Sequence, residues 1–313
     1  MDSFIKKPLV SIITPSYNQG EFLEDTILSV LSQDYSDIEY ILIDGGSTDN
    51  SMDIIRQYED RISDWVSEKD MGQAHAINKG LLRSRGEFLG WLNSDDILLP
   101  STVSRVIKVF NEYPDIDVVY GRLERIDERN KVIPTPILPK DRIEFSKEYV
   151  IGECVVNQPG AFWRRRIMEK AGLLDQNLKY ALDYEFWIRI ALAGGQFRRI
   201  PEVVARFRLN RLSKTSNQTS EMAMEQLNVL ERTLTIEDLD RKLGINEDQV
   251  RRCANKARSV IQLHVSYGYL KKRKIGSAIY WLWRALQNNP LTLFEKRWLD
   301  LAVTGLTRRI INW

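Results

Sequence analysis

The feature that most constrains the fold is a repeated alternation of short β-branched runs with longer segments of helical periodicity. Short apolar runs are typical of buried strands, and apolar residues three and four apart are typical of amphipathic helices. Repeats of this kind favour a mostly parallel sheet with right-handed helical crossovers. Residues 9–14, 38–43, 62–66, 88–92 and 118–120 predict strands, and residues 21–31, 51–58, 74–83 and 102–113 predict helices.

The regularity ends after the fifth predicted strand. Residues 121–160 contain four prolines, so we expect loops and short additional strands there. Residues 182–193 again have helical periodicity, and residues 197–200 and 203–207 predict a closing pair of strands. We therefore interpret residues 1–215 as one α/β domain with a Rossmann-like sheet flanked by helices, which is an ordinary domain size.

Residues 216–313 predict a helical tail of different character, with helical periodicity at 222–234 and 262–283. Residues 250–313 contain 13 Lys or Arg and two acids, a net charge of +11 in a chain of net charge +2, and four of the eight tryptophans. Such helices suit an anionic membrane surface, and the alternative is a helical cap with a tryptophan core. No nucleic-acid-binding motif accompanies the charge, so we expect no nucleic-acid partner.

The sequence also bears on the compartment. The two cysteines lie far apart in the sequence and form no Cys-x-x-Cys motif, which is unlike a disulfide framework. No signal-peptide pattern and no apolar run of membrane-spanning length are visible. We expect a cytoplasmic protein, peripheral on the inner face of the membrane if the basic tail binds lipid.

Acidic side chains follow two of the predicted strands. Asp44 ends the second strand, and Asp95 and Asp96 follow the fourth. In open parallel sheets, ligands bind beyond the carboxyl ends of the strands. Adjacent carboxylates repel unless a cation compensates, and a hard divalent ion bound by carboxylates and phosphates would do so. The alternative is a solvated turn, because Asn-Ser-Asp-Asp is also good turn chemistry.

Other kinds of site are missing from the sequence. Neither a G-x-G-x-x-G motif after a strand nor a G-x-x-x-x-G-K-[ST] motif is present, so a nucleotide would be held by carboxylate-to-hydroxyl bonds and a cation-bridged diphosphate. His75 and His264 are the two histidines, which excludes a zinc site of several His ligands. We interpret His75 as a structural or surface residue and His264 as structural.

Six sequence blocks follow one another along the chain: residues 12–18, 43–49, 72–80, 92–96, 158–162 and 183–189. In this order they together resemble glycosyltransferase family 2, over roughly residues 8–215. The resemblance implies a GT-A fold and an inverting, hexosyltransferase-type enzyme with a nucleoside-diphosphate sugar donor. It also implies a sugar or lipid-linked glycan acceptor, in the synthesis of polysaccharide, lipopolysaccharide or another cell-surface glycan. The alternatives are a nucleotidyltransferase-like metal–nucleotide enzyme and a non-catalytic nucleotide-sugar-binding scaffold.

The resemblance assigns residues to the donor. Pro15 and Tyr17 would line the nucleobase pocket, and Asp44 would bond the base or the ribose. Gln73 and Asp95 would complete the nucleotide-sugar site.

The resemblance also implies a divalent cation, Mn²⁺ or Mg²⁺, with Asp96 as its direct ligand. Two positions depart from the family pattern: Asn93 stands where Asp is frequent, and Asn210 where His is frequent. Asn210 could offer its carbonyl oxygen to the cation, or Arg208 or Arg211 could balance the diphosphate charge; the sequence leaves both open.

Asp183 stands where the family places its catalytic base, which accepts the acceptor's hydroxyl proton. An acid there also suits the first turn of a helix, where the helix dipole stabilises negative charge. Glu185 is the reserve base. A loop would border the acceptor, and Trp163 beside it is the tryptophan best placed to stack on a sugar, unless it is a core aromatic. The acceptor residues are Gln158, Pro159, Gly160 and Trp163.

Overall fold

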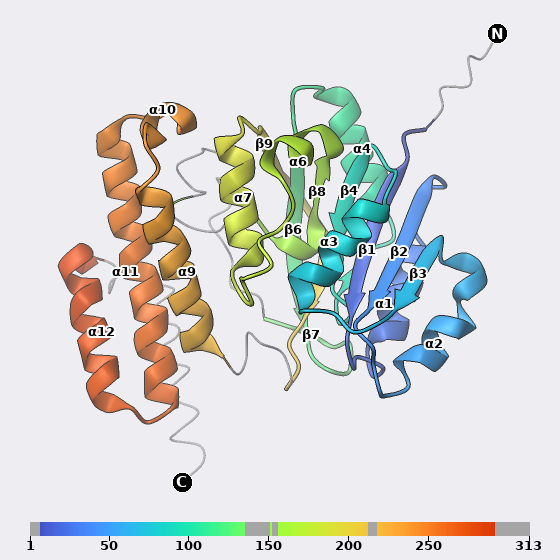
Figure 1. Ribbon diagram of the computed structural model, residues 1–313, viewed down its shortest axis with the longest axis horizontal. Helices are drawn as coiled ribbons and strands as arrows, with labels where there is room; N and C mark the ends of the chain where they lie inside the picture. The colour runs from blue at the N-terminus through green and yellow to red at the C-terminus, as the bar shows by residue number, and fades with distance from the viewer. Residues whose placement is uncertain (1–6, 135–150, 152–155, 212–217, 292–313) are drawn as a thin grey trace. The chain divides into compact units, whose positions relative to one another are not determined.

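The computed structural model describes residues 7–134, 151, 156–211 and 218–291 (Figure 1). Contacts divide the chain into two compact units. The sheet unit carries all the described strands and ends at Asn210, and the helical unit carries the helices that follow. We describe each unit by itself. Among the described residues, no helix has the length and apolar character needed to cross a membrane.

The described residues of the sheet unit form one nine-stranded sheet in the order β3-β2-β1-β4-β8-β6-β9-β5, with β7 paired to β6. Strands β1, β2, β3 and β4 are mutually parallel. β8 runs antiparallel to both β4 and β6, and β9 runs parallel to β6. The strands are β1 Val10–Ser16, β2 Ile38–Asp44, β3 Asp64–Ser67, β4 Phe88–Trp91, β5 Ile97–Leu98, β6 Val118–Ile126, β7 Val132–Ile133, β8 Ala161–Arg164 and β9 Phe197–Arg208.

Helices cover both faces of this sheet because strand side chains alternate between the faces. Ile12 and Leu42 belong to a buried cluster with apolar residues of α1, α2 and α4, whereas Ile41 and Ile43 pack with Ala76 of α3 on the opposite face. The helices are α1 Leu23–Leu31, α2 Ser51–Gln57, α3 Gln73–Arg83, α4 Thr102–Glu112, α6 Arg165–Ala171 and α7 Leu182–Leu192, with 3₁₀ turns at Glu59–Arg61 and Gln158–Gly160.

The predicted α/β sheet flanked by helices is confirmed, although four of its eight described strand pairings are antiparallel, and the five predicted strands and five predicted helices of the sheet unit are all present. The prediction of a closing pair of strands is wrong, because residues 197–208 form one strand, β9. Its pairing with β6 shifts register between Tyr120 and Arg122, opposite Arg199 and Val203. This β-bulge takes up Pro201, which lacks the N–H that a regular ladder requires.

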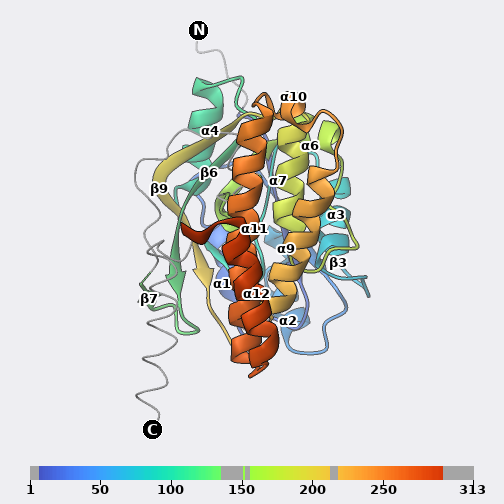
Figure 2. The same cartoon turned by 90° about the vertical axis from the view of Figure 1, so that its left-hand side faces the viewer.

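The helical unit contains α9 Thr219–Leu234, α10 Leu239–Leu243, α11 Glu247–Lys271 and α12 Ile275–Asn288. α11 packs against both α9 and α12 (Figures 1 and 2). The helix expected at residues 262–283 is therefore two helices, α11 and α12. They are separated by a turn in which Arg273 takes a left-handed conformation, with φ of 58°. The boundary at residue 215 between two domains stays our proposal.

α11 and α12 meet through small side chains. The Ser259 hydroxyl donates to the Ala285 carbonyl over 2.8 Å, and the Ser266 hydroxyl donates to the Ala278 carbonyl over 2.7 Å. The two serines are seven residues apart on α11, and the two alanines are seven residues apart on α12. This spacing corresponds to about two helical turns. The contact therefore uses serine and alanine and leaves the larger apolar residues of α12 on other faces.

Candidate functional site

The acidic residues singled out from the sequence lie at one edge of the sheet. β1, β2 and β4 are parallel, and Ser16 and Asp44 are register partners at the ends of β1 and β2. Asp95 and Asp96 follow the end of β4. β9 shares the direction of β4, because both β6 and β4 run antiparallel to β8. These acids therefore occupy the carboxyl edge, where open α/β sheets bind ligands.

The first turn of α7, which contains Asp183, lies at the same edge. α7 is followed after a short loop by β9, so its last turn lies where β9 begins, at the opposite edge. Figure 1 shows α7 lying along the strands, with its first turn toward their carboxyl ends. The eleven residues of α7 span about 16 Å. The fold thus brings Asp183 to the edge that carries Asp44 and Asp96.

The Asp44 carboxylate organises the loop that follows it. It accepts hydrogen bonds from the backbone of Gly46 and Ser47 over 3.0 and 2.9 Å, from the Ser47 hydroxyl, and from the Ser67 hydroxyl over 2.6 Å. Gly46 has φ of 81°, a conformation that suits glycine. Asp44 is fully buried, and both of its carboxylate oxygens accept hydrogen bonds from the protein. Its contact with a base or ribose stays a prediction.

The loop after β1 is joined to the loop after β2. The side-chain amide oxygen of Asn18 accepts from the Thr48 backbone over 2.8 Å, and the Asn18 backbone donates to the Ser47 hydroxyl over 2.8 Å. Just before Asn18 in the sequence, Pro15 of β1 is buried and Tyr17 is exposed. The Ser16 hydroxyl is buried and has no hydrogen-bond partner among the described residues. This edge therefore presents an exposed aromatic ring next to a buried hydroxyl.

Asn93 connects three side chains at the end of β4. Its amide oxygen accepts from Gln73 over 2.8 Å, and its amide nitrogen lies within hydrogen-bond distance of Asp96 Oδ2 at 3.2 Å and of Gln158 Oε1 at 3.0 Å. Gln158 also donates to the Trp91 carbonyl over 2.8 Å. An aspartate here could not donate to the other two groups. Asn93, one of the two residues that depart from the family pattern, is therefore the centre of the network.

The two adjacent acids have different surroundings. Asp96 is fully buried, and its Oδ1 accepts from the Arg208 backbone over 3.1 Å. Asp95 is partly buried, and its Oδ2 accepts from the Asn210 amide nitrogen over 2.9 Å. Burial, and next the charge of Asp95, raise the pKa of Asp96 well above its usual range. The pair thus carries an electrostatic cost that a positive charge would relieve.

This chemistry fits a divalent cation held mainly by substrate. Asp95 and Asp96 supply carboxylate oxygens, which hard cations prefer. The described residues contain no group of three or more His, Cys, Asp or Glu placed to hold a metal. Two protein ligands are enough where phosphate oxygens complete the shell. Asn210 donates its amide nitrogen to Asp95, which supports an orienting role more directly than the ligand role expected from the sequence.

Arg208 is a structural residue of the site and not a free diphosphate ligand. Its side chain is fully buried and donates to the carbonyls of Asp95 and Asp127, to Asn130 Oδ1 and to Asp25 Oδ2, over 2.6–3.3 Å. Its guanidinium also lies over the Phe22 ring. The sequence-based option that Arg208 binds the diphosphate is therefore wrong, because its guanidinium is already committed to protein acceptors.

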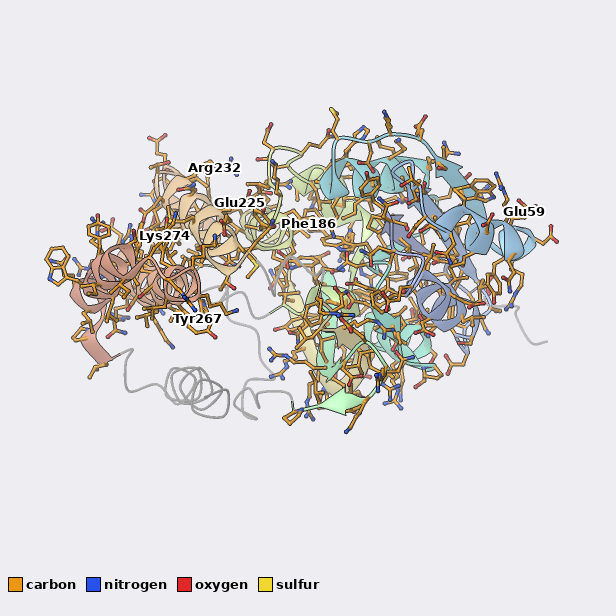
Figure 3. The ribbon with its side chains drawn as sticks, turned by 90° about the horizontal axis from the view of Figure 1, so that it is seen from below. Glu59, Phe186, Glu225, Arg232, Tyr267 and Lys274 are labelled. Carbon is orange, nitrogen blue, oxygen red and sulfur yellow. The ribbon has the colours of Figure 1, made fainter. Side chains whose placement is uncertain are left out.

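An aromatic cluster fixes α7 on the sheet. The ring of Trp187 stacks on Trp91 with centroids 6.0 Å apart, and Trp163 meets both Trp91 and Phe186 edge-on at 5.5 and 5.4 Å. Figure 3 labels Phe186 on α7. Asp183 lies one turn before Trp187, so this packing sets the position of Asp183 relative to β4.

Asp183 has the environment of a base that works near neutral pH. Burial raises its pKa to about 6, against the lowering effect of a hydrogen bond from the Tyr184 backbone, which is 2.8 Å long. Glu185 is paired with Arg189 over 2.7 Å, and Arg189 also donates to the carbonyls of Ala171 and Leu173. Glu185 thus stabilises the start of α7, and Asp183 is the better candidate for proton transfer.

The acceptor assignment of Trp163 needs correction. Only 1% of Trp163 is exposed, and its ring is enclosed by the aromatic cluster, so no face is open to a sugar. Gln158, Pro159 and Gly160 form a buried 3₁₀ turn that joins the end of β4 through Gln158. That turn stays our prediction for the region next to the acceptor.

Two other predictions concern His75 and the tryptophans of the tail. His75 accepts from the Met71 backbone over 3.3 Å, in agreement with a structural role. Trp298 and Trp313 of the tail lie outside the described residues.

The sequence did not identify three residues that organise the site: Asn93, Asn18 and Arg208. For Asn93 the only signal was its departure from the family pattern, whereas Arg208 bonds groups more than 75 residues away in the sequence.

The chain is similar in sequence to known proteins. The family model described as glycosyl transferase family 2 matches residues 11–172. An uncharacterized glycosyltransferase of Rickettsia prowazekii is 31% identical over 198 residues, which cover 60% of this chain and 60% of that relative. The chain thus spans about three fifths of that relative's length. The putative teichuronic acid biosynthesis glycosyltransferase TuaG of Bacillus subtilis is 47% identical over 93 residues, 29% of this chain and 37% of that relative.

Solved structures share the fold at low sequence identity. The crystal structure of S. aureus TarS 1-349 in complex with UDP-GlcNAc has a TM-score of 0.59 and 14% identity, covering 89% of this chain and 92% of that chain. The mannosyltransferase PcManGT from Pyrobaculum calidifontis, in complex with GDP-Man and Mn²⁺, has a TM-score of 0.65 and 16% identity, covering 98% and 81%.

Proposed function

The chain belongs to glycosyl transferase family 2, and from this premise we propose that it transfers a sugar from a nucleoside-diphosphate sugar to a hydroxyl group of an acceptor. Its fold is that of the GT-A glycosyltransferases. The structures of TarS and PcManGT hold UDP-GlcNAc and GDP-Man respectively, which supports a nucleotide-sugar donor for this chain.

One observation carries the proposal. The carboxyl edge of the sheet combines two adjacent acids, the fully buried Asp96 and the partly buried Asp95, with a separate acid, Asp183, whose pKa is raised to about 6. The first pair suits a cation-bound diphosphate, and a carboxylate with a raised pKa suits proton abstraction. Transfer to a hydroxyl group needs both functions at the same edge.

In the proposed reaction, Asp183 accepts the proton of the acceptor hydroxyl as its oxygen attacks the anomeric carbon. The attack comes from the face opposite the departing diphosphate, so the configuration at that carbon inverts. Pro15, Tyr17, Asp44, Gln73 and Asp95 form the donor side of the site. Their first task is to orient the donor, which converts a bimolecular encounter into a reaction within one complex.

A divalent cation, Mn²⁺ or Mg²⁺, would be held by Asp96 and Asp95 and would neutralise the charge that develops on the departing diphosphate. Asn93 and the Arg208 backbone hold the Asp96 carboxylate, and Asn210 holds that of Asp95. This shell fixes the direction of the carboxylates before any ligand arrives.

We further propose that the acceptor is a sugar or a lipid-linked glycan, in the synthesis of a cell-surface polymer on the cytoplasmic side of the membrane. TuaG carries the name of a putative teichuronic acid biosynthesis glycosyltransferase, which supports this context for a chain that shares 47% identity with it over 93 residues. The basic character of residues 250–313 supports work close to an anionic surface.

The test is a donor panel. The full chain is incubated with UDP-, GDP- and dTDP-sugars and Mn²⁺, and release of nucleoside diphosphate is measured with and without acceptor saccharides. We expect turnover with one class of donor, loss of turnover in Asp96→Asn, and a large fall of kcat in Asp183→Asn with donor affinity kept.

The other outcomes separate the alternatives. Release of pyrophosphate from a nucleoside triphosphate would identify a nucleotidyltransferase. A donor-dependent rise in melting temperature without turnover under any condition would identify a binding scaffold.

A further inference from the structure

α12 presents large apolar side chains to its surroundings. Ile275, Ile279 and Trp283 follow one another at intervals of four residues and are 63%, 61% and 55% exposed. Leu282 and Leu286 lie on the same side of the helix and are partly buried. Six of the eleven exposed large apolar side chains among the described residues belong to residues 270–291. Four of these six, Ile275, Ile279, Tyr280 and Trp283, belong to α12, so the exposure is concentrated on this helix.

This apolar stripe is not left over from the packing of α11. The buried residues of α12 are Ala278 and Ala285, which contact α11 through the bonds of Ser259 and Ser266. The helix thus fully buries only small residues, and its large apolar residues are exposed or partly buried. Exposed large apolar side chains that line up on one helix face mark a surface for a partner.

A cluster of positive charge borders the stripe. The end of α11 and the turn before α12 carry four exposed cations, Lys271, Lys272, Arg273 and Lys274, and Figure 3 labels Lys274. Arg284 adds a fifth cation, and residues 271–291 contain no Asp or Glu. Lys272 is paired with Glu221 of α9, which leaves the segment strongly basic even after that pair is counted.

We propose that this α12 surface, formed by Ile275, Ile279 and Trp283 with the basic turn at residues 271–274, docks on an anionic lipid bilayer. Helices that lie in the interface of a bilayer combine an apolar face containing Trp with Lys and Arg beside it. The apolar side chains enter the boundary between headgroups and acyl chains, and the basic turn contacts the anionic headgroups. The charge favours an anionic bilayer over a protein partner. Residues 271–291 hold five cations and no acid, and an apolar protein surface would not require this excess of positive charge.

The proposal does not depend on the sugar transferred and can be tested without substrate. The full chain is mixed with vesicles of phosphatidylcholine alone or of phosphatidylcholine with phosphatidylglycerol, and the bound fraction is measured by flotation. We expect binding to the anionic vesicles only, weakened by high salt because salt screens the basic turn.

Two variants address the two parts of the surface. Ile279→Ser with Trp283→Ser removes the centre of the stripe, and Arg273→Glu with Lys274→Glu reverses charge in the turn. Each pair should lower vesicle binding by roughly tenfold or more. Leu82→Ser on α3 and Lys108→Glu on α4 are matched controls at exposed positions outside the surface, and both should bind like the wild type.

Three results would overturn the inference. They are wild-type protein that fails to float with anionic vesicles at low salt, either double variant floating as well as wild type, and a dimer in solution that Ile279→Ser with Trp283→Ser dissolves. The last result would assign the stripe to a second copy of the chain. Circular dichroism checks that the variants are folded, and donor turnover on a soluble acceptor, measured separately, reports on the proposed function.

Discussion

The side-chain amide nitrogen of Asn93 lies 3.2 Å from Oδ2 of the fully buried carboxylate of Asp96. The same nitrogen lies 3.0 Å from Gln158 Oε1. Asn93 is thus a donor in a place where a carboxylate would be a third acceptor next to Asp95 and Asp96. This relationship gives the first prediction.

Asn93→Asp should make the folded chain depend on a cation for stability. The substitution removes the donor to Asp96 and adds a negative charge beside two others, which should cost about 1–3 kcal/mol without metal. Thermal unfolding in EDTA should show a lower melting temperature than wild type, and Mn²⁺ should recover more of the difference in the variant. Equal melting temperatures in EDTA would mean that Asn93 does not hold Asp96.

Asp183→Asn should abolish proton abstraction and leave donor binding intact. General bases typically contribute 10²–10⁴-fold, so kcat should fall by roughly that factor. Glu185→Gln is the neighbouring control, because Glu185 is paired with Arg189. It should lower the melting temperature and keep most of kcat below that temperature. A larger kcat loss in Glu185→Gln than in Asp183→Asn would reverse the assignment.

The activity of the wild type should rise with pH through about 6. Asp183 works as a base only when ionised, and burial raises its pKa to about 6. The expected profile of kcat/KM has an acid limb with that apparent pKa, measured with the cation saturating at each pH. An acid limb centred near 4 would indicate a carboxylate in an ordinary environment.

The ionisation of Asp183, which activity requires, should lower the free energy of unfolding. In the unfolded chain this carboxyl titrates near 3.8, so between pH 3.8 and 6 the folded state binds more protons. The contribution of Asp183 to stability is therefore complete below pH 3.8 and is lost as pH rises to 6. Asp183→Asn should be more stable than wild type above pH 6, by about 1–3 kcal/mol, in urea unfolding. No gain would show that the carboxylate is not desolvated.

Arg208→Met should destabilise the sheet unit strongly. It leaves Asp25, Asn130 and two backbone carbonyls without their donor inside the fold, and breaking a buried charged network typically costs about 3–5 kcal/mol. Arg206→Met, two residues earlier on β9, is the control. Arg206 is only partly buried and pairs with Glu124, so its loss should cost about 1 kcal/mol or less. Similar losses in both variants would contradict the role of Arg208.

The sequence predicts most of the sheet unit because the signals there are local. β2 and α3 follow from apolar spacing within a dozen residues, and both are found within one or two residues of the expected bounds. β9 differs because its continuity depends on a bulge against β6, and the residues that pair there lie about 80 positions apart. Pairing at that distance leaves no periodic signal in either segment.

The positions of the candidate acids in the fold were predictable from the sequence, whereas the residues that hold them were not. Asp44, Asp96 and Asp183 stand at element ends that can be found from the sequence. The partners of Arg208 cannot be found in this way, because Asp25 and Asn130 join it only in the folded chain. Trp163 shows the same limit. Its sequence position fits a place beside the acceptor, but only the packing of Trp187 and Phe186 around it reveals that the ring is enclosed.

The last residues of the sheet unit have a practical consequence for dividing this protein into fragments. Arg208 closes β9 and Asn210 follows it, and these two residues donate to Asp96 and Asp95 respectively. A fragment truncated where the final strand is easiest to recognise, at residue 207, would keep every acid and lose both donors. Any expression fragment of the sheet unit must extend past Asn210, or its inactivity will be mistaken for a requirement for the helices.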